Sequence, residues 1–414
     1  MQKSKICTVY TLLGIPVFLM RKTVERERIY FLGMKIFSRK NKIERKSGFD
    51  KLRKRMVGIE GLNVVVWFDH SLGGGTEVYS DRKIEELRED CVVFRIQYLS
   101  RKKKFVVTVI DNIFCDYYIL NSFEELSIVL RDGVFQRVVV NNLVGYGDSL
   151  KVLGLLKSLR SRRSFHVSVN LHDFQCVCPN FNLMYEGREF CGLQIAKCRH
   201  CFSDMGIRMN PLLLSGVKDL DLWRCVWRDF FVTTCDQVFA FSESSKDIFL
   251  KMYPEASAKV VVCPHTLPYL RPARVKKHDG LNVAFLGSIC SEAKGASVVR
   301  NLVLCNKNEK IHFFVIGDFV NPPKNLIVLG KYVIDQLPDI VEEREIDLII
   351  IPSVWPETFS YTTSEAIQLN IPVGSFNMGA QCDKIKGVKR RILFSDKKPE
   401  TMLREIEDFY RNNG

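Results

Sequence analysis

Apolar and polar positions follow one pattern through most of the 414-residue chain. Short apolar runs such as NVVVWF, RVVVNNLVGY and IDLIIIPS recur, and segments with helical periodicity, such as SLKVLGLLKSLRSRR, lie between several of them. Runs that are apolar throughout are typical of strands buried on both faces of a parallel sheet. The chain is therefore expected to be an α/β protein whose parallel sheets are covered by helices on both sides.

This pattern occurs twice, with a break between the two copies. The segment TLPYLRPARVKKHDG (266–280) is polar, basic and Pro-containing, which is typical of a domain linker. The apolar runs start again after it with LNVAFLGS, KIHFFVIGD, NLIVLG, IDLIIIPS and IPVGSF. We expect two Rossmann-like domains, 61–270 and 281–396, that face each other across a cleft. A Cys-rich, loop-rich insert is expected at 175–210, and a final helix at 397–414.

Residues 1–60 depart from this pattern. The apolar run ICTVYTLLGIPVFLM (6–20) is short for a bilayer span, Pro16 interrupts it, and no small-residue cleavage site follows. Residues 21–56 then carry fourteen Lys and Arg against four acidic residues. Such a segment can lie on an anionic membrane surface. It can also be a solvated basic arm of the first domain, and both interpretations remain open.

The overall composition and net charge indicate which classes of partner the chain can bind. The chain is 46% hydrophobic and 26% charged, which argues against global disorder, and its net charge of +14 favours an anionic partner. Nucleic acid, an acidic membrane and a phosphorylated substrate all fit that charge. No interleaving of aromatic and basic residues marks a nucleic-acid-binding face, so no nucleic acid is expected. Fourteen cysteines without a visible secretory signal favour reduced thiols in the cytoplasm.

Glycines and polar residues stand at the ends of several expected strands, where open parallel sheets bind ligands. LGGGTE brings Gly73, Gly74 and Gly75 to the start of a helix, and its backbone N–H groups can approach an anion there. A tight turn would need the same glycines. LHDF places His172 and Asp173 at another strand end. His172 can hydrogen-bond a ligand or transfer a proton, although a structural histidine fits the position equally.

Lys294 lies seven residues after Gly287 in FLGSICSEAKG. A lysine there can neutralise a diphosphate as a point charge, and a solvated lysine is the alternative.

The strongest signal is PSVWPETFSYTTSEAI (352–367), between a buried strand and a helix. Ser360 or Thr362 is the expected N-cap, so the backbone N–H groups near residues 359–362 form an anion site. Glu357 lies on the loop before it, and Glu365 lies in the second turn of the helix. Two carboxylates on either side of a bound diphosphate suit a nucleotide-sugar, with the ribose on one and the sugar on the other. An ordinary helix with two surface acids is the alternative.

PETFSYTTSEAI resembles the E-x7-E signature of the retaining GT-B-fold glycosyltransferases, the "group 1" family. GGGTE, LGS with the later KG, and IPVGSF support the resemblance, which covers roughly residues 61–396. Two further features resemble bacterial cell-surface polysaccharide and O-antigen glycosyltransferases in particular. One is the succession of HDF, CP, CG and C-x-x-C along the insert, and the other is the segment WPETFSYT.

The resemblance implies a hexosyl transfer from a nucleotide-sugar to a lipid-linked glycan, with retention of anomeric configuration and without a cofactor or catalytic metal. It also implies a peripheral protein on the inner face of the cytoplasmic membrane. Glu357, His172 and Lys294 would be the catalytic residues. The donor would be bound by Glu365, Gly287, Ser288, Phe359, Ser360, Tyr361, Thr362, Gly73, Gly74, Gly75 and Asp173.

Two positions depart from the family. Ser288 stands where an arginine is frequent, and NMGAQ carries only Gly379 where paired glycines are usual. A nucleotide-sugar epimerase or hydrolase on the same fold remains an alternative, because a fold does not fix a function. A basic nucleic-acid-binding protein is the third hypothesis.

Four cysteines of the insert, Cys178, Cys191, Cys198 and Cys201, lie within 24 residues, and the last two form a C-x-x-C pair. Four thiolates in a loop-rich insert can hold a structural Zn²⁺. Reduced thiols and a disulfide are the alternatives.

Overall fold

The computed structural model describes residues 48–59, 61–185, 189–202 and 219–413, together with four N-terminal strands. These four strands pair antiparallel in the order β1 (Cys7–Leu12), β2 (Ile15–Lys22), β3 (Arg26–Phe31) and β4 (Met34–Lys40). The rest of the segment 1–47, on which the membrane interpretation partly depends, lies outside the described residues.

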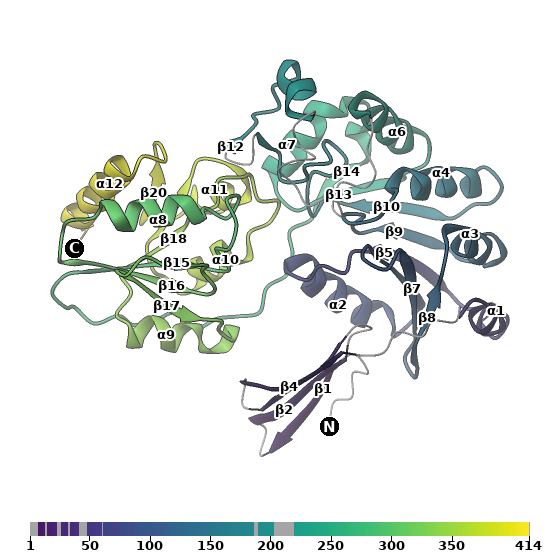
Figure 1. Cartoon of the computed structure of the whole chain (residues 1–414), viewed down its shortest axis with the longest axis horizontal. Coiled ribbons are helices and arrows are strands. Elements are labelled where there is room, and N and C mark those ends of the chain that lie inside the picture. Colours follow the sequence, from purple (N-terminus) through teal and green to yellow (C-terminus); the bar gives the residue numbers. More distant parts are fainter. Residues whose placement is uncertain are drawn as a thin grey trace. The chain divides into compact units, whose positions relative to one another are not determined.

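An eight-stranded sheet follows, in the order β14-β13-β10-β9-β5-β6-β7-β8 (Figure 1). Its strands are β5 (Val64–Asp69), β6 (Val92–Leu99), β7 (Lys104–Ile110), β8 (Cys115–Leu120), β9 (Arg137–Val140), β10 (His166–Asn170), β13 (Gln237–Ala240) and β14 (Val260–Val262). Helices α1 (Phe49–Val57), α2 (Gly75–Leu87), α3 (Phe123–Asp132), α4 (Ser149–Arg160) and α6 (Leu220–Thr233) accompany it. Ser122, Asp148 and Asp219 begin α3, α4 and α6 as side-chain N-caps, because each oxygen accepts an N–H of the first turn.

The expected parallel pairing is confirmed for β10-β9-β5-β6 and is wrong for the edge beyond it. Strands β7 and β8 run antiparallel to their neighbours. The connections around 100–103 and 111–114 are short, and only antiparallel strands can be joined by so few residues.

The second sheet is parallel throughout, in the order β17-β16-β15-β18-β19-β20. Its strands are β15 (Leu281–Leu286), β16 (Ile311–Ile316), β17 (Leu326–Gly330), β18 (Leu348–Ile351), β19 (Val373–Phe376) and β20 (Arg391–Phe394). The central strand β18 is fully buried, as its apolar run predicts.

Helices cover both faces of this sheet. They are α8 (Ala296–Cys305), α9 (Leu337–Glu343), α10 (Tyr361–Gln368), α11 (Gly379–Ile385) and α12 (Pro399–Asn413), with a 3₁₀ turn at Ile334–Gln336 before α9. Leu337 and Val341 of α9 and Ala366 of α10 pack into one apolar cluster with strand residues. In Figure 1, α8 and α12 lie on the other side of the sheet from α9.

By contacts, the chain divides into two units. The first is Met1–Asn170 with Asn210–Val238, and the second is Leu171–Met209 with Phe239–Gly414. The second unit also holds β11 (Met184–Tyr185), β12 (Glu189–Phe190), the 3₁₀ turns Ile195–Lys197 and Pro254–Lys259, and α7 (Glu243–Met252). The fold is thus α/β with parallel sheets in two domains. None of the described helices is long and apolar enough to cross a membrane.

Candidate functional site

The loop after β18 carries the first of the two predicted glutamates, Glu357. Its side chain is 5% exposed and accepts hydrogen bonds from Lys294 Nζ at 2.5 Å and Ser353 Oγ at 2.5 Å. Burial acts to raise the pKa of Glu357, but the charge and hydrogen bond of Lys294 and the hydroxyls of Ser353 and Ser360 outweigh it. The net pKa is below its usual value, so Glu357 is a buried carboxylate that stays charged.

The second glutamate, Glu365, lies in the second turn of α10. Ser360 precedes this helix at the predicted N-cap position with φ 59°, and its side chain makes no cap hydrogen bond. The first N–H groups of α10 therefore have no side-chain acceptor there. Glu365 is 7% exposed and accepts a hydrogen bond from the Tyr332 hydroxyl at 2.6 Å. Burial raises the pKa of Glu365, and the Tyr332 bond partly opposes that rise.

The loop after β15 packs against both of these segments. Gly287 has φ 113°, and a Cβ there would lie 3.1 Å from Cγ2 of Thr362 at the start of α10. Gly295 has φ 82°, and an added Cβ would overlap the carbonyl oxygen of Pro352 after β18. Both positions need glycine, because the backbone is left-handed and the neighbouring segment is close. This packing holds Lys294, which lies between the two glycines, next to Glu357.

An aromatic cluster borders the start of α10. The Phe359 ring stacks on His265 with centroids 4.3 Å apart, and His265 Nδ1 lies 2.7 Å from the Tyr361 hydroxyl. His172 is buried, with its ring centroid 5.5 Å from that of His265 and 4.6 Å from that of Phe241. Thr358 Oγ1 donates to the carbonyl oxygen of His172 at 2.9 Å. The structure therefore brings the predicted His172 to the loop that carries Glu357.

Lys384 of α11 lies over the ring of Phe359. Its Nζ is 3.5 Å from the centroid of the Phe359 ring and donates to Ser364 Oγ at 2.6 Å. Burial lowers the pKa of Lys384 to about 8, and the nearby charge of Glu357 opposes this shift. Gly379, at the start of α11, has φ 66°, and a Cβ there would lie 2.6 Å from the backbone nitrogen of Glu357. The single glycine of NMGAQ therefore allows α11 to pack directly behind Glu357.

Other predicted residues are placed differently. Ser288 is exposed, with its hydroxyl 3.5 Å from the thiol of Cys290, and Asp173 accepts the backbone N–H of Gln175 at 2.8 Å. Gly73, Gly74 and Gly75 lie at the start of α2 in the first unit.

The four cysteines of the insert lie within the described residues. Over that part of the chain, no group of three or more His, Cys, Asp or Glu side chains is arranged to hold a metal ion. Zn²⁺ at Cys178, Cys191, Cys198 and Cys201 stays a prediction from the sequence.

Three residues of this site, His265, Tyr332 and Lys384, were not among those predicted from the sequence. His265 follows the apolar run KVVVC, so the criterion that selected His172 at a strand end would have found it. Tyr332 follows NLIVLG and could have been found in the same way. Lys384 carries no such signal, because only the packing of α11 on the start of α10 brings it to Phe359.

No protein-family model and no curated protein sequence matches the chain. Its fold does match solved structures. HepE of Anabaena in complex with UDP has a TM-score of 0.54 and 11% identity, over 85% of this chain and 90% of that chain. Sucrose-phosphate synthase of Thermosynechococcus elongatus has a TM-score of 0.53 and 11% identity, over 84% and 90%. The lipopolysaccharide outer core galactosyltransferase WaaB has a TM-score of 0.51 and 12% identity, over 85% and 91%. At these identities the likeness establishes the fold, which is the GT-B fold of glycosyltransferases.

Proposed function

We propose that the protein is a glycosyltransferase that moves a hexosyl group from a nucleotide-sugar to a glycan acceptor with retention of anomeric configuration. One observation carries the proposal. Two buried glutamates flank the uncapped start of α10, with one on Lys294 and the other on Tyr332. The fold supports it, because the similar HepE was solved with UDP and with UDP-glucose.

Different groups of the site would bind the ribose, the diphosphate and the sugar of the donor. Glu365, an acceptor of hydrogen bonds, takes the ribose hydroxyls in place of the Tyr332 hydroxyl. The diphosphate lies at the start of α10, where the N–H groups of residues 360–362 and the helix dipole favour an anion. Gly287, where an added Cβ would lie 3.1 Å from Thr362, borders that position, and Ser288 follows it in the chain. Glu357 takes hydroxyls of the transferred sugar, with His172 beside it.

The chemical step breaks the bond between the anomeric carbon and the diphosphate oxygen, and the bonding electrons leave with the diphosphate. A hydroxyl oxygen of the acceptor forms the new bond on the same face of the sugar, and its proton passes to an oxygen of the departing diphosphate. Lys294 and the α10 dipole stabilise the charge that develops on the leaving group. A lysine has three donors, so Lys294 can hold Glu357 and a phosphoryl oxygen together.

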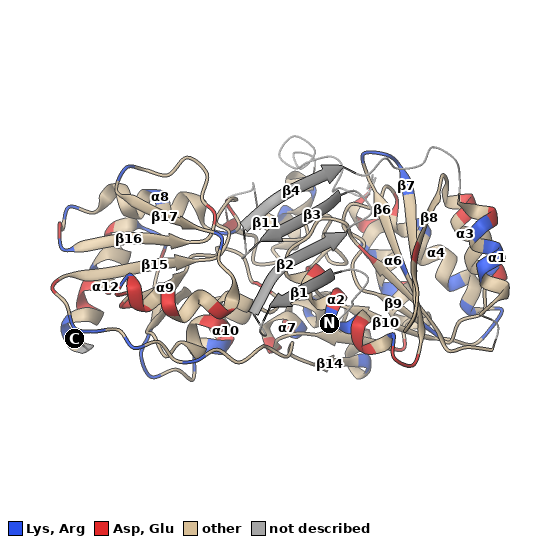
Figure 2. Cartoon of the chain, turned by 90° about the horizontal axis from the view of Figure 1, so that it is seen from below, with Lys and Arg blue, Asp and Glu red and all other residues tan. Residues whose placement is uncertain are grey.

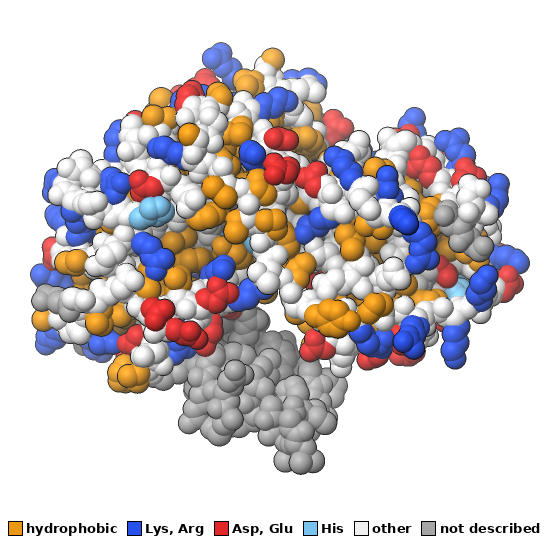
Figure 3. Space-filling view, turned by 180° about the vertical axis from the view of Figure 1, so that it is seen from behind, with side chains coloured by type: hydrophobic (Ala, Val, Ile, Leu, Met, Phe, Trp, Pro, Cys, Tyr) orange, Lys and Arg blue, Asp and Glu red, His pale blue; other side chains and the backbone are white. Residues whose placement is uncertain are grey.

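The acceptor is proposed to be lipid-linked, as in the synthesis of cell-surface polysaccharide. The net charge of +14 supports a peripheral position on the anionic inner face of the cytoplasmic membrane. In Figure 3, Lys and Arg side chains are interspersed with Asp and Glu, so the positive charge does not form one continuous field on that face.

The test is a thermal-shift screen of the full chain against UDP, GDP, dTDP, CMP and their common sugar conjugates, repeated with Glu365→Gln. A nucleotide that stabilises the wild type but not Glu365→Gln supports the donor site. Glu309→Gln is the matched control, because Glu309 is exposed in the same unit. Turnover of the donor without any acceptor would favour the epimerase or hydrolase alternative. No stabilisation by any nucleotide, together with no transfer to membrane extracts, would refute the proposal.

A further inference from the structure

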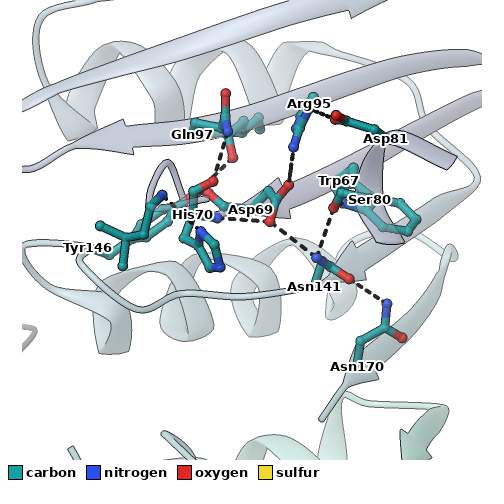
Figure 4. Close-up of polar contacts among 12 residues, drawn as sticks. Trp67, Asp69, His70, Ser80, Asp81, Arg95, Gln97, Asn141, Tyr146 and Asn170 are labelled. Atoms are coloured by element: carbon teal, nitrogen blue, oxygen red, sulfur yellow. Dashed lines mark hydrogen bonds and ion pairs between the residues drawn. The ribbon is translucent and has the colours of Figure 1, made fainter. Parts of the chain in front are cut away.

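The buried charges at the end of β5 in the first unit are paired with one another. Arg95 is 6% exposed, and its guanidinium donates to Asp69 Oδ2 at 2.6 Å and to Asp81 Oδ1 at 2.8 Å (Figure 4). Asp69 Oδ1 accepts from Asn141 Nδ2 at 3.1 Å and from the backbone N–H of His70 at 3.0 Å. A buried polar network whose groups have partners of this kind stabilises the fold and needs no external ligand.

Exposed cations of the second unit differ, because five of them have no such partner. They lie on the linker 266–280 and on the segment 386–391, and none forms an ion pair within the described part of the chain: Lys276, Lys277, Lys389, Arg390 and Arg391. Other cations of the same two segments are paired, Arg271 with Glu342 at 2.5 Å and Lys386 with Asp383 at 3.6 Å. The five remaining positive charges favour an anionic partner.

Both segments contact the C-terminal end of α10. The backbone N–H of Ala273 donates to the carbonyl oxygen of Leu369 at 3.0 Å, and Arg390 Nη2 donates to the carbonyl oxygen of Asn370 at 2.8 Å. Carbonyl groups at a helix C-terminus have no partner inside the helix, so these bonds cap α10. Capping accounts for the position of Arg390. It does not account for Lys389, whose side chain makes no hydrogen bond within the described residues.

A pocket of about 390 Å³ lies at the same end of α10, and we call it the α10 pocket. Its lining consists of Ile367, Asn370, Ile371, Val388, Lys389 and Arg390. The apolar part is aliphatic and contains no aromatic ring on which a nucleic-acid base could stack. An aliphatic pocket bordered by cations fits an amphiphilic anion, because the chain leaves water while the charged group meets the cations.

We propose that the α10 pocket is a docking surface for an anionic phospholipid membrane. Lys389 and Arg390 hold a lipid phosphate, and the acyl chain of that lipid lies on the aliphatic side chains of the pocket. Lys276 and Lys277 add to the attraction, since each cation near an anionic membrane contributes to binding. The inference rests on the proposed function, in which a lipid-linked acceptor brings the enzyme to a membrane.

The α10 pocket and the candidate donor site lie at opposite ends of α10. Strands β18 and β19 are parallel neighbours, so the helix that connects them runs back from the C-terminal edge of the sheet to the N-terminal edge. The eight residues of α10 span about 12 Å along the helix axis. Substitutions at the α10 pocket should therefore change membrane binding without changing nucleotide binding.

The experiment measures flotation of the full chain with vesicles of phosphatidylglycerol and phosphatidylcholine in equal amounts. Lys389→Glu reverses one exposed charge of the α10 pocket and should weaken binding roughly tenfold to thirtyfold. Lys324→Glu is the matched control, because Lys324 is exposed in the same unit and the net charge changes equally. It should weaken binding only about twofold, since salt screens charges far from the membrane. Equal losses in the two variants would overturn the proposal.

Val388→Thr tests the place of the acyl chain. Threonine has nearly the volume of valine and leaves the charge of the α10 pocket unchanged, but it replaces a methyl group with a hydroxyl group. Binding to the same vesicles should weaken roughly threefold to tenfold, and Val388→Ile should bind like the wild type. No loss for Val388→Thr would show that no chain enters the pocket.

Competition gives the same test without a substitution, for the case that Val388→Thr does not fold. Dodecyl phosphate should displace the wild type from the vesicles, whereas glycerol 3-phosphate at the same concentration should not. Equal displacement by both compounds would assign the α10 pocket to free phosphate groups and would overturn the membrane as its partner. Tighter binding of single-stranded RNA or of polyglutamate than of the vesicles, lost in Lys389→Glu, would overturn it as well.

Thermal shifts with nucleotides separate this inference from the proposed function. A nucleotide shift that is unchanged in Lys389→Glu, together with weakened vesicle binding, supports the docking surface. If no nucleotide stabilises the wild type, the proposed function fails on its own, and flotation of Lys389→Glu still tests the α10 pocket.

Discussion

At the residue scale, Lys294 and Glu357 form one unit, since the lysine keeps the buried carboxylate charged. Glu357→Gln retains the volume and removes the charge. We expect kcat for transfer to fall about a hundredfold, as for the loss of one electrostatic group in a site, with little change in nucleotide affinity. Initial rates at saturating donor, together with calorimetry of nucleotide binding, check this split. An unchanged kcat would remove Glu357 from the mechanism.

The pH dependence of donor binding should report Glu365. Burial raises its pKa, so the carboxylate takes up a proton at a higher pH than an exposed glutamate does. The protonated form loses acceptor capacity, and nucleotide affinity should therefore decrease as the pH falls through this raised pKa. Tyr332→Phe removes the hydrogen bond that opposes the rise, so the midpoint should move to higher pH. The measurement is the Kd of the bound nucleotide from pH 5 to pH 8.

Glu365→Gln is the control for this titration, because an amide has no proton to gain. Its Kd for a nucleotide-sugar, whose diphosphate has no group that titrates in this range, should be weaker than that of the wild type. This Kd should also be flat from pH 5 to pH 7, below the pKa of about 8 of Lys384. A wild-type profile as flat as that of Glu365→Gln would show that Glu365 does not contact the nucleotide.

At the scale of elements, the site depends on the close packing of the loop after β15 against the loop after β18. Substitutions at two glycines with the same φ can measure how much free energy this packing contributes. Gly295 and Gly330 both have φ 82°, but only at Gly295 would a Cβ meet the Pro352 carbonyl, and Gly330 has open space. Gly330→Ala should cost about 1–2 kcal/mol of unfolding free energy from backbone conformation alone. Gly295→Ala should cost about 3 kcal/mol or more, since the loop must also move. Urea unfolding followed by circular dichroism measures both.

Nucleotide binding by the two variants distinguishes a local change at the site from a general loss of stability. Gly295→Ala should also weaken nucleotide binding, because the displaced loop carries Lys294 and borders the start of α10. Gly330→Ala should leave nucleotide binding close to that of the wild type. Equal stability losses in the two variants would mean that the loops relax without cost.

The helices and strands also show which parts of the fold and of the site could be predicted from the sequence. Continuous apolar runs predicted the parallel strands around β18, and the E-x7-E spacing placed Glu357 and Glu365 on either side of the start of α10. The antiparallel direction of β7 and β8 was not predicted, because it depends on the short connections before each strand and not on the hydrophobic pattern. Tyr332 follows the apolar run NLIVLG, so its place at a strand end could have been predicted. Lys384 reaches the site only by packing, so no local spacing marks it.

At the scale of the whole molecule, the excess of positive charge predicts binding to an anionic surface. Figure 2 shows Lys and Arg along α1. Two of these residues are already paired, Arg53 with Asp132 at 3.2 Å and Arg55 with Asp111 at 2.9 Å. Lys51 and Lys54 are exposed and make no ion pair within the described residues. They are therefore the cations of α1 that a membrane can recruit without breaking an existing pair.

Lys51→Gln with Lys54→Gln should weaken binding to phosphatidylglycerol vesicles, since each lysine near such a surface contributes about 1 kcal/mol. Vesicle co-sedimentation should show a loss of roughly tenfold or more at low salt, and a smaller loss at high salt because ions screen the attraction. Lys307→Gln with Lys324→Gln changes the net charge equally, on exposed residues of the second unit. If both pairs weaken binding to the same extent, the membrane responds to net charge alone and α1 has no special part in docking.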